Sequence, residues 1–306
     1  MDSLTHALLV AALLTAIGAP ELVPFGILGA VILDADVLFQ LVSSKRPSLY
    51  MFIHGGAAHS IAGAAGMAVI AFVAMYFLLL AGGRVLHFII PFSFNLFALT
   101  AVITGAMLHV ALDFLATPGI PLCWPWKDTR YTAGVFAGPS AVMMFISLTF
   151  ILLFIAGVVP ISGLICYGIL FLVYFVISVT IRIVAAIKIH GRTIPTINPL
   201  RWLVIEKSDD YWSLKFLNLL TGYESGNRAW PMYSGVTQEE INRISSIPAV
   251  RRVRYHSSFT IARRLDNGNI VIQDPTRVEG IVRYPPYYTR IILKQTEGED
   301  WEVIGE

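Results

Sequence analysis

Apolar stretches long enough to cross a membrane occupy most of the first 190 residues of the chain. A spanning helix needs about 20 mainly apolar residues, and fewer where it stops partway through the hydrocarbon. Six segments meet this description: Leu4–Ala19, Leu22–Val42, Ala58–Ala81, Phe88–Leu115, Ala141–Val159 and Ile161–Ile187. We therefore predict an all-α membrane helix bundle of about six transmembrane helices.

Three of the connections between these segments are short and rich in Pro or Gly. They are Ala19–Glu21, Gly82–Arg84 and Val159–Ile161. Such connections favour an antiparallel hairpin between the flanking helices. The bundle is therefore expected to run up and down through the membrane.

The pattern changes near His190, and after Pro199 it becomes one of short strands. "RWLVIEKSDDYWSLKFL" predicts two strands around a Ser-Asp-Asp turn, and "FTIARRLDNGNIVIQD" and "YTRIILKQTEGEDWEVI" each predict a hairpin. Thr237 and Glu240 have the spacing of a capping box at the start of a helix. We predict a transmembrane helical domain over residues 1–190 and a small α+β soluble domain over residues 191–306.

The composition supports a bilayer as the main solvent of this chain. Hydrophobic residues make up 56% and charged residues only 14%, far from the balance of a soluble domain. The net charge of +2 is too small to indicate nucleic-acid binding. Cys123 and Cys166 have no CxxC spacing, so no disulfide framework or thiolate zinc site is expected. The sequence leaves the oligomeric state open.

Basic residues near the segment ends predict the orientation, because Lys and Arg are retained on the cytoplasmic side. In the predicted bundle, one face carries Lys45, Arg46, Lys127, Arg130, Arg182, Lys188 and Arg192. Only Arg84 falls on the other face. The N-terminus and the C-terminal domain are therefore both expected to be cytoplasmic, in an integral cell membrane protein.

Ionisable side chains inside membrane segments are costly and mark a functional site by default. Four pairs of His and Asp residues stand out: Asp2 and His6, Asp34 and Asp36, His54 and His59, His109 and Asp113. The pairs alternate between helix starts and helix ends, so an up-and-down bundle brings all four to one face. His6 and Asp34 each lie roughly 20 Å from the first hairpin, at 1.5 Å per residue, which places them at one depth.

Four imidazoles and four carboxylates form a mixed donor set suited to Zn, Mn or Fe. We predict a site for one or two divalent ions, most consistent with zinc, held by these eight residues. The competing interpretation is a buried hydrogen-bond network of His and Asp without metal.

The motifs that carry these pairs resemble a known family. "MDSLTHALL", "LDAD", "HGGAAHS", "HVALD" and "TPGIPLCWPWKDTRY" are similar, in that order, to the signatures of the YdjM-like family of predicted membrane-bound metal-dependent hydrolases. The resemblance covers roughly residues 1–135, and the remainder looks like longer members with a C-terminal soluble domain. It implies the same eight residues as metal ligands. Leu33 replaces the family's usual Pro, and "HGGAAHS" lacks the usual Arg and Thr, which puts a substrate contact in doubt.

The leading hypothesis is hydrolysis of a phosphoester or lipid-like substrate by metal-activated water. Whichever of Asp34 and Asp36 is not fully engaged as a ligand is expected to be the general base. Lys127 and Arg130 are candidates to bind a phosphate, although topology signals explain them equally well. The alternatives are an ion carrier or metal-sensing membrane protein without catalysis, and a scaffold whose soluble domain binds a partner.

Overall fold

The computed structural model describes residues 1–89, 93–138, 140–283, 288–296 and 300–305, and divides the chain into two units. The first unit comprises Met1–Gln40, Met51–Ile187 and Ile194–Arg201. The second comprises Leu41–Tyr50, Lys188–Thr193 and Trp202–Glu306. A ten-residue segment from the helical half of the sequence thus belongs to the second unit.

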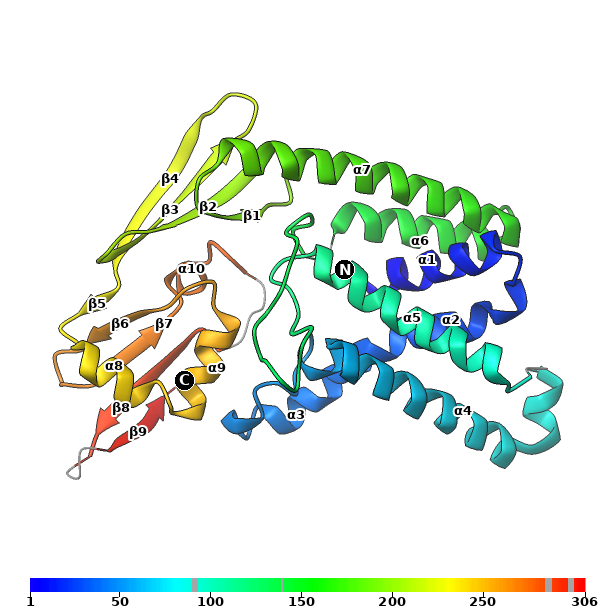
Figure 1. The fold of residues 1–306 in the computed structure, drawn as a ribbon, viewed down its shortest axis with the longest axis horizontal. Coiled ribbons are helices and arrows are strands. Elements are labelled where there is room, and N and C mark those ends of the chain that lie inside the picture. The colour runs from blue at the N-terminus through cyan, green and yellow to red at the C-terminus, as the bar shows by residue number, and fades with distance from the viewer. Residues whose placement is uncertain (90–92, 139, 284–287, 297–299, 306) are drawn as a thin grey trace. The chain divides into compact units, whose positions relative to one another are not determined.

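Helices make up the regular structure of most of the N-terminal part (Figure 1). The α-helices are α1 (Ser3–Ala16), α2 (Val23–Ile32), α3 (Gln40–Ser43), α4 (Ile61–Ile89), α5 (Leu96–Leu115), α6 (Ala141–Ile155) and α7 (Leu164–Lys188). Short 3₁₀ segments join them: η1 (Pro20–Leu22), η2 (Leu33–Phe39), η3 (Pro47–Leu49), η4 (Ala57–His59) and η5 (Ile161–Gly163). Within the first unit, α2 packs against α1 and α5, and α5 also packs against α4.

Four helical stretches among the described residues are long and apolar enough to cross a membrane: Pro20–Ser43, Ile61–Ala81, Leu96–Leu115 and Ile161–Lys188. The apolar helices α1 and α6 are shorter, with 14 and 15 residues. At 1.5 Å per residue each extends only about 22 Å, less than the roughly 30 Å of a hydrocarbon core. The structure thus has a helical region with four candidate spans, and the predicted count of about six is not confirmed.

Three of the predicted elements differ in the structure, and one of them is the helix predicted from Phe88, because α5 begins at Leu96 and Phe88 lies in α4. The turn predicted at Gly82–Arg84 is wrong, because α4 continues through these residues to Ile89. Glycine is tolerated inside apolar helices, where the intrahelical hydrogen bonds remain the only partners of the backbone. The predicted segment Leu22–Val42 is not a uniform α-helix, since it passes into the 3₁₀ segment η2 at Leu33. This change of helix type occurs where the two aspartates lie.

Glycine allows α2 and α5 to approach each other closely. A Cβ atom added to Gly29 would lie 1.8 Å from the carbonyl oxygen of Val102, and one on Gly105 would lie 2.1 Å from that of Gly26. No side chain fits at these distances, so the two backbones are in direct contact. Small residues provide such close packing between membrane helices. The contact brings α5 within reach of the last turn of α2.

The segment after α5 folds back on the end of that helix. The amides of Ala133 and Val135 donate to the carbonyls of Phe114 and Leu115, at 2.8 Å each. Further along the segment, Ile120 pairs with Tyr131 in an antiparallel bridge. This segment, residues 116–137, therefore has its two ends fixed beside the C-terminus of α5.

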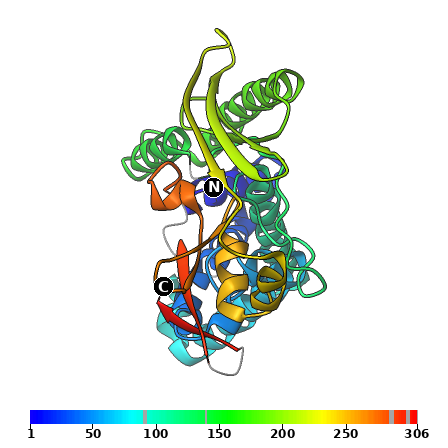
Figure 2. The same ribbon diagram turned by 90° about the vertical axis from the view of Figure 1, so that its left-hand side faces the viewer.

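Among its described residues, the C-terminal part has two sheets and three helices. Its elements are β1 (Arg192–Pro195), β2 (Arg201–Lys207), β3 (Tyr211–Asn218), β4 (Glu224–Pro231), β5 (Tyr233–Ser234), α8 (Gln238–Ile244), α9 (Pro248–His256), β6 (Ile261–Arg264), β7 (Ile270–Gln273), α10 (Pro275–Val278), β8 (Arg290–Gln295) and β9 (Trp301–Gly305). One sheet has the order β1-β2-β3-β4 and the other β5-β6-β7-β8-β9. Figure 2 shows β3 and β4 as a long twisted ribbon.

The local patterns in this part predicted its elements well. The Ser-Asp-Asp turn joins β2 to β3, and the Asn-Gly turn joins the antiparallel pair β6 and β7. Both hydrogen bonds of the capping box at Thr237 and Glu240 are present at the start of α8. The apolar sides of α8 and α9 pack with β6, β7 and β8 in one core that includes Ile244, Val250 and Ile272.

Candidate metal centre

Helix α1 carries His6 on its buried side. Asp2 caps the helix: its side chain accepts from the amide of Thr5 at 3.0 Å and from the Thr5 hydroxyl at 2.7 Å. This cap fixes the first turn, so the side chain of His6, one residue after Thr5, is completely buried. Neither ring nitrogen of His6 has a hydrogen-bond partner among the described residues.

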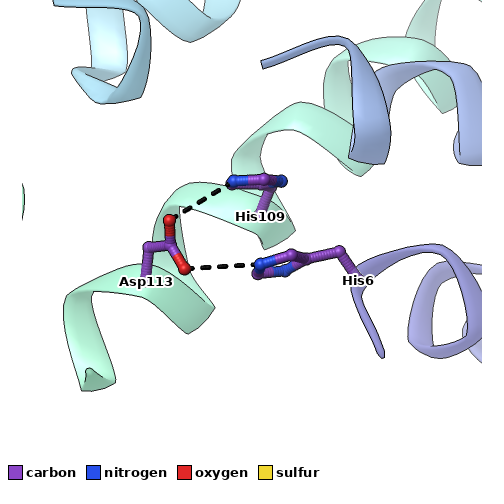
Figure 3. A group of neighbouring side chains, drawn as sticks. All are labelled: His6, His109 and Asp113. Atoms are coloured by element: carbon purple, nitrogen blue, oxygen red, sulfur yellow. Dashed lines mark ion pairs between the residues drawn. The ribbon is translucent and has the colours of Figure 1, made fainter. Parts of the chain in front are cut away.

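Helix α5 contributes His109 and Asp113, which lie four residues apart on one face. Their side chains come close, with His109 Nε2 3.4 Å from Asp113 Oδ2. His6 Nε2 lies 3.3 Å from the other carboxylate oxygen, Oδ1. Figure 3 shows the two imidazoles side by side with the carboxylate facing both. The rings are stacked with their centroids 3.8 Å apart.

The second nitrogen of His109 has a partner in α2. Its Nδ1 lies 2.6 Å from the carbonyl oxygen of Ala30, to which it donates. The close approach of α2 and α5 at Gly29 makes this contact possible. A backbone acceptor on one ring nitrogen orients the ring and leaves the other free to bind a metal. Nε2 of His109 is therefore the nitrogen presented to the centre.

The 3₁₀ segment η2 presents Asp34 and Asp36. Asp34 Oδ1 lies 3.6 Å from Nε2 of both His59 and His109, and its Oδ2 accepts from the Ser3 hydroxyl. The Asp34 side chain is 19% exposed, whereas that of Asp36 is fully buried. The two aspartates thus differ in their access to solvent.

Asp36 contacts both histidines of "HGGAAHS". His54 Nδ1 lies 2.9 Å from Asp36 Oδ1, and His59 Nδ1 lies 3.0 Å from Oδ2. The amide of Gly55 also donates to Oδ2, at 3.2 Å. His59 is completely buried, but the side chain of His54 is 31% exposed. The cluster is therefore closed on the side of His6 and open at His54 and Asp34.

Three overlapping groups of side chains could each hold a metal ion: His6, His109 and Asp113; Asp34, His59 and His109; Asp36, His54 and His59. His59 and His109 each belong to two groups, so the three form one continuous cluster. Within each group the potential ligand atoms lie within 4.8 Å of one another. The charge also fits, because one fully buried and two partly buried carboxylates gather there, and a dication would offset them.

The distances distinguish two kinds of contact in this cluster. Two donors about 2.1 Å from one tetrahedral zinc ion lie about 3.4 Å apart. The distances from His6, His59 and His109 Nε2 to Asp34 and Asp113 are 3.3–3.6 Å, which match this value. The contacts of Asp36 with the Nδ1 atoms are shorter: a hydrogen bond of 2.9 Å with His54 and an ion-pair contact of 3.0 Å with His59. The residues present therefore fit a metal bound through Nε2, with Asp36 on the Nδ1 side of two histidines.

Seven of the eight ligands predicted from the sequence lie in this cluster. The eighth, Asp2, lies in none of the three groups, and its carboxylate caps α1 instead. Its role as a ligand stays a prediction, as does phosphate binding by Lys127 and Arg130. These two residues belong to the segment 116–137, where Lys127 is exposed and Arg130 partly buried.

Sequence reasoning missed the groups that hold the ligands in place. They are the Ser3 hydroxyl on Asp34, the Ala30 carbonyl on His109 and the Gly55 amide on Asp36. Ser3 and Gly55 are adjacent in sequence to predicted ligands, which is a weak signal for such a role. A backbone carbonyl such as that of Ala30 has no signature in the sequence.

A comparison with models of protein families finds a match. The model of a family described as "YdjM inner membrane protein" matches residues 1–186, which include all eight predicted ligands. No curated protein and no solved structure matches the chain.

Proposed function

This chain belongs to the YdjM inner membrane protein family, and on that premise we propose that it is a membrane-embedded metal-dependent hydrolase of phosphoester or lipid-like substrates. The observation that carries the proposal is the convergence of three Nε2 atoms on Asp34 and Asp113, beside an edge that opens at His54. A buried network that served only stability would need no such opening. The proposal gives the cluster a substrate as well as a metal.

The ion would be held by Asp34, His59, His109 and Asp113. His6 lies beside these four residues. A bound divalent ion supplies two effects, a lower pKa for coordinated water and stabilisation of charge on phosphoryl oxygens. Zinc suits the mixed imidazole and carboxylate donors best, and Mn or Fe are the next candidates. The overlapping groups allow one or two ions.

In this proposal His54 transfers the proton, and Asp36 orients its ring. Asp34 faces two imidazole Nε2 atoms and is engaged as a ligand, whereas Asp36 bonds to Nδ1 of His54. This contact leaves Nε2 of the partly exposed His54 ring for water or substrate. A histidine held by a carboxylate is a common general acid and base.

Aromatic side chains on the segments that form the open edge support a lipid-like substrate. Phe52, two residues before His54, makes edge contacts with Phe39 at 6.4 Å and with Trp124 at 5.9 Å. Trp126 in the segment 116–137 is 81% exposed. Aromatic residues gather at the level of lipid headgroups, where one side of the ring is apolar and the other polar. Substrate would then enter from the membrane interface.

An ion carrier is the second candidate, and a buried polar chain favours it. The Thr5 hydroxyl, which is bonded to Asp2, lies 3.0 Å from the Ser147 hydroxyl. Ser147 in turn lies 2.6 Å from the hydroxyl of Tyr167, so polar groups extend from α1 into α6 and α7. A carrier needs a polar path of this kind across the membrane.

One experiment on the purified full-length protein separates the two candidates. Elemental analysis measures bound metal, and hydrolysis is then assayed with bis(p-nitrophenyl) phosphate and with phospholipid vesicles. We expect metal in the protein, and hydrolysis that stops with a chelator and returns with Zn²⁺ or Mn²⁺. Metal uptake into proteoliposomes without hydrolysis would support the carrier, and absence of metal would contradict both.

The orientation is also part of the proposal, with the N-terminus and the C-terminal domain in the cytoplasm. Basic residues near the segment ends support it. Single cysteines at positions 45 and 250 should be protected from an impermeant reagent in intact cells, whereas cysteine at position 161 should react. Labelling of position 45 or 250 from outside would contradict this orientation.

A further inference from the structure

The segment Leu41–Tyr50 lies between Asp36 and His54 in the sequence, but it belongs to the C-terminal unit. It begins five residues after Asp36 and ends four residues before His54. The side chains of these two residues meet at 2.9 Å. Any displacement of the segment would therefore act on both partners of that contact.

Arg252 on α9 holds the start of this segment. Its side chain is only 1% exposed, and Nη1 donates to the carbonyls of Ser43 and Ser44 at 3.3 and 3.4 Å. The guanidinium also lies 4.0 Å from the centroid of the Tyr288 ring. A buried cation is costly unless such groups surround it. Ser43 is itself completely buried, so this contact lies in the interior of the unit.

A second contact holds the end of the segment. The ring of Tyr50 lies 5.5 Å from that of Tyr255, three residues after Arg252 on the same helix. The 3₁₀ turn η3, Pro47–Leu49, also packs against α9. Helix α9 thus contacts the segment at its start and at its end.

We infer that Arg252 is a positioning residue for the candidate metal centre. By fixing the segment Leu41–Tyr50, which follows η2 along the chain, α9 holds Asp36 in place against the Nδ1 atoms of His54 and His59, and Nε2 of His59 is one of the proposed ligand atoms. Sites of this kind lose function when the supporting contacts allow about 1 Å of movement. The inference rests on the proposed metal binding, and it assigns the C-terminal domain a role in positioning residues of the metal centre.

The test uses the full-length protein and Co²⁺, whose visible absorption reports ligand geometry. Arg252→Gln removes the charge and most donors, and the exposed neighbour Arg251→Gln is the matched control. A third variant inserts Gly-Gly between Arg46 and Pro47, which loosens the segment without altering α9. Titration against a competing chelator gives affinities, and thermal unfolding shows whether each variant is folded.

We expect Arg252→Gln and the insertion to weaken Co²⁺ binding roughly tenfold to a hundredfold and to change the spectrum, as loss of a supporting contact does at other metal sites. Arg251→Gln should behave like the parent. Because both changes act through one segment, combining them should cost little more than either alone. If Arg252→Gln does not fold, the variant with the Gly-Gly insertion tests the inference by itself.

The inference would be overturned if a folded variant that lacks Arg252 or carries the insertion had the same Co²⁺ affinity and the same spectrum as the parent. A parent protein that binds no Co²⁺ contradicts the proposed function, and this inference with it. The two failures are therefore distinguishable by the parent's own titration.

Discussion

Buried charged groups occur in both units, but their surroundings differ. In the C-terminal unit, Asp274 is fully buried and accepts from the Ser258 amide and from the amide and hydroxyl of Thr276. Arg277 lies 3.5 Å away as its ion-pair partner. In the helical unit, by contrast, the buried His6 has no hydrogen bond among the described residues, although the Asp113 carboxylate lies 3.3 Å from its Nε2.

This difference separates a structural cluster from a functional one. Protein donors and acceptors satisfy Asp274, so nothing further is needed to keep it buried. In the helical unit the N-terminal ammonium pairs with Asp113 and the Ser3 hydroxyl bonds to Asp34, but the Nε2 atoms of His6, His59 and His109 lie 3.3–3.6 Å from these carboxylates, a spacing that suits a shared ion. An arrangement that is incomplete by itself points to a ligand, and four experiments test this difference between the units.

Loss of the imidazole at the open edge should give the largest effect. His54→Ala removes the proposed proton-transfer group, and we expect hydrolysis to fall by about 10²–10⁴. Metal bound through the Nε2 atoms of the other histidines should remain in elemental analysis. The exposed His190→Ala should retain activity. Full activity of His54→Ala would show that proton transfer occurs elsewhere.

Changes on α5 test the metal itself. Asp113→Asn keeps the side-chain volume but removes a charge, and His109→Ala removes a donor. Each should lower metal affinity by about 10–100-fold or more, measured as metal content after dialysis against a weak chelator. Asp209→Asn, on an exposed turn, is the control. If all of these proteins and the parent hold equal metal, or none, the cluster is a hydrogen-bond network.

The cluster around Asp274 should respond in stability and not in chemistry. Asp274→Asn replaces one acceptor oxygen by a donor, leaving buried amide or hydroxyl groups unsatisfied. We expect the free energy of unfolding of the C-terminal unit to fall by about 1–3 kcal/mol in denaturant titrations. Asp209→Asn should change it by less than about 0.5 kcal/mol. An unchanged unfolding midpoint for Asp274→Asn would show that the cluster around Asp274 does not stabilise the C-terminal unit.

The smallest effect concerns the start of α8. The hydrogen bond from the Thr237 amide, and next the Arg264 guanidinium, hold the pKa of Glu240 below its ordinary value of 4.5. Because the folded pKa is the lower one, its stabilisation is present above 4.5 and is lost as pH falls through the folded value. The stability difference between the parent and Glu240→Gln should therefore shrink as pH is lowered from 6 to 3. A difference that stays constant over this range would contradict it.

The sequence predicted those features that depend on local patterns. Apolar length located the helices, and the capping box at Thr237 and the Asn-Gly turn located elements of the C-terminal unit correctly. The four His and Asp pairs were predicted to meet because they alternate between helix starts and ends, and seven of these residues do meet. Periodicity and spacing were sufficient for these conclusions.

Features set by tertiary contacts were not predictable in the same way. Apolar composition alone could not show that α1 and α6 are too short to rank with the four candidate spans, or that α4 continues past Arg84. The spacing of Asp2 from His6 did not show that its carboxylate caps α1, and its role as a ligand stays a prediction. Nor does any local signal assign Leu41–Tyr50 to the second unit, since its contacts with α9 span about 200 residues.

The direct backbone contact at Gly29 and Gly105 has a consequence for reading genetic variation in this protein. Any side chain at either position forces α2 and α5 apart, and the imidazole of His109 then loses the Ala30 carbonyl that orients it. A loss-of-function screen should therefore recover these glycines together with the histidines and aspartates. Such substitutions would resemble ligand mutations in every metal assay, although neither glycine carries an atom that could bind the ion.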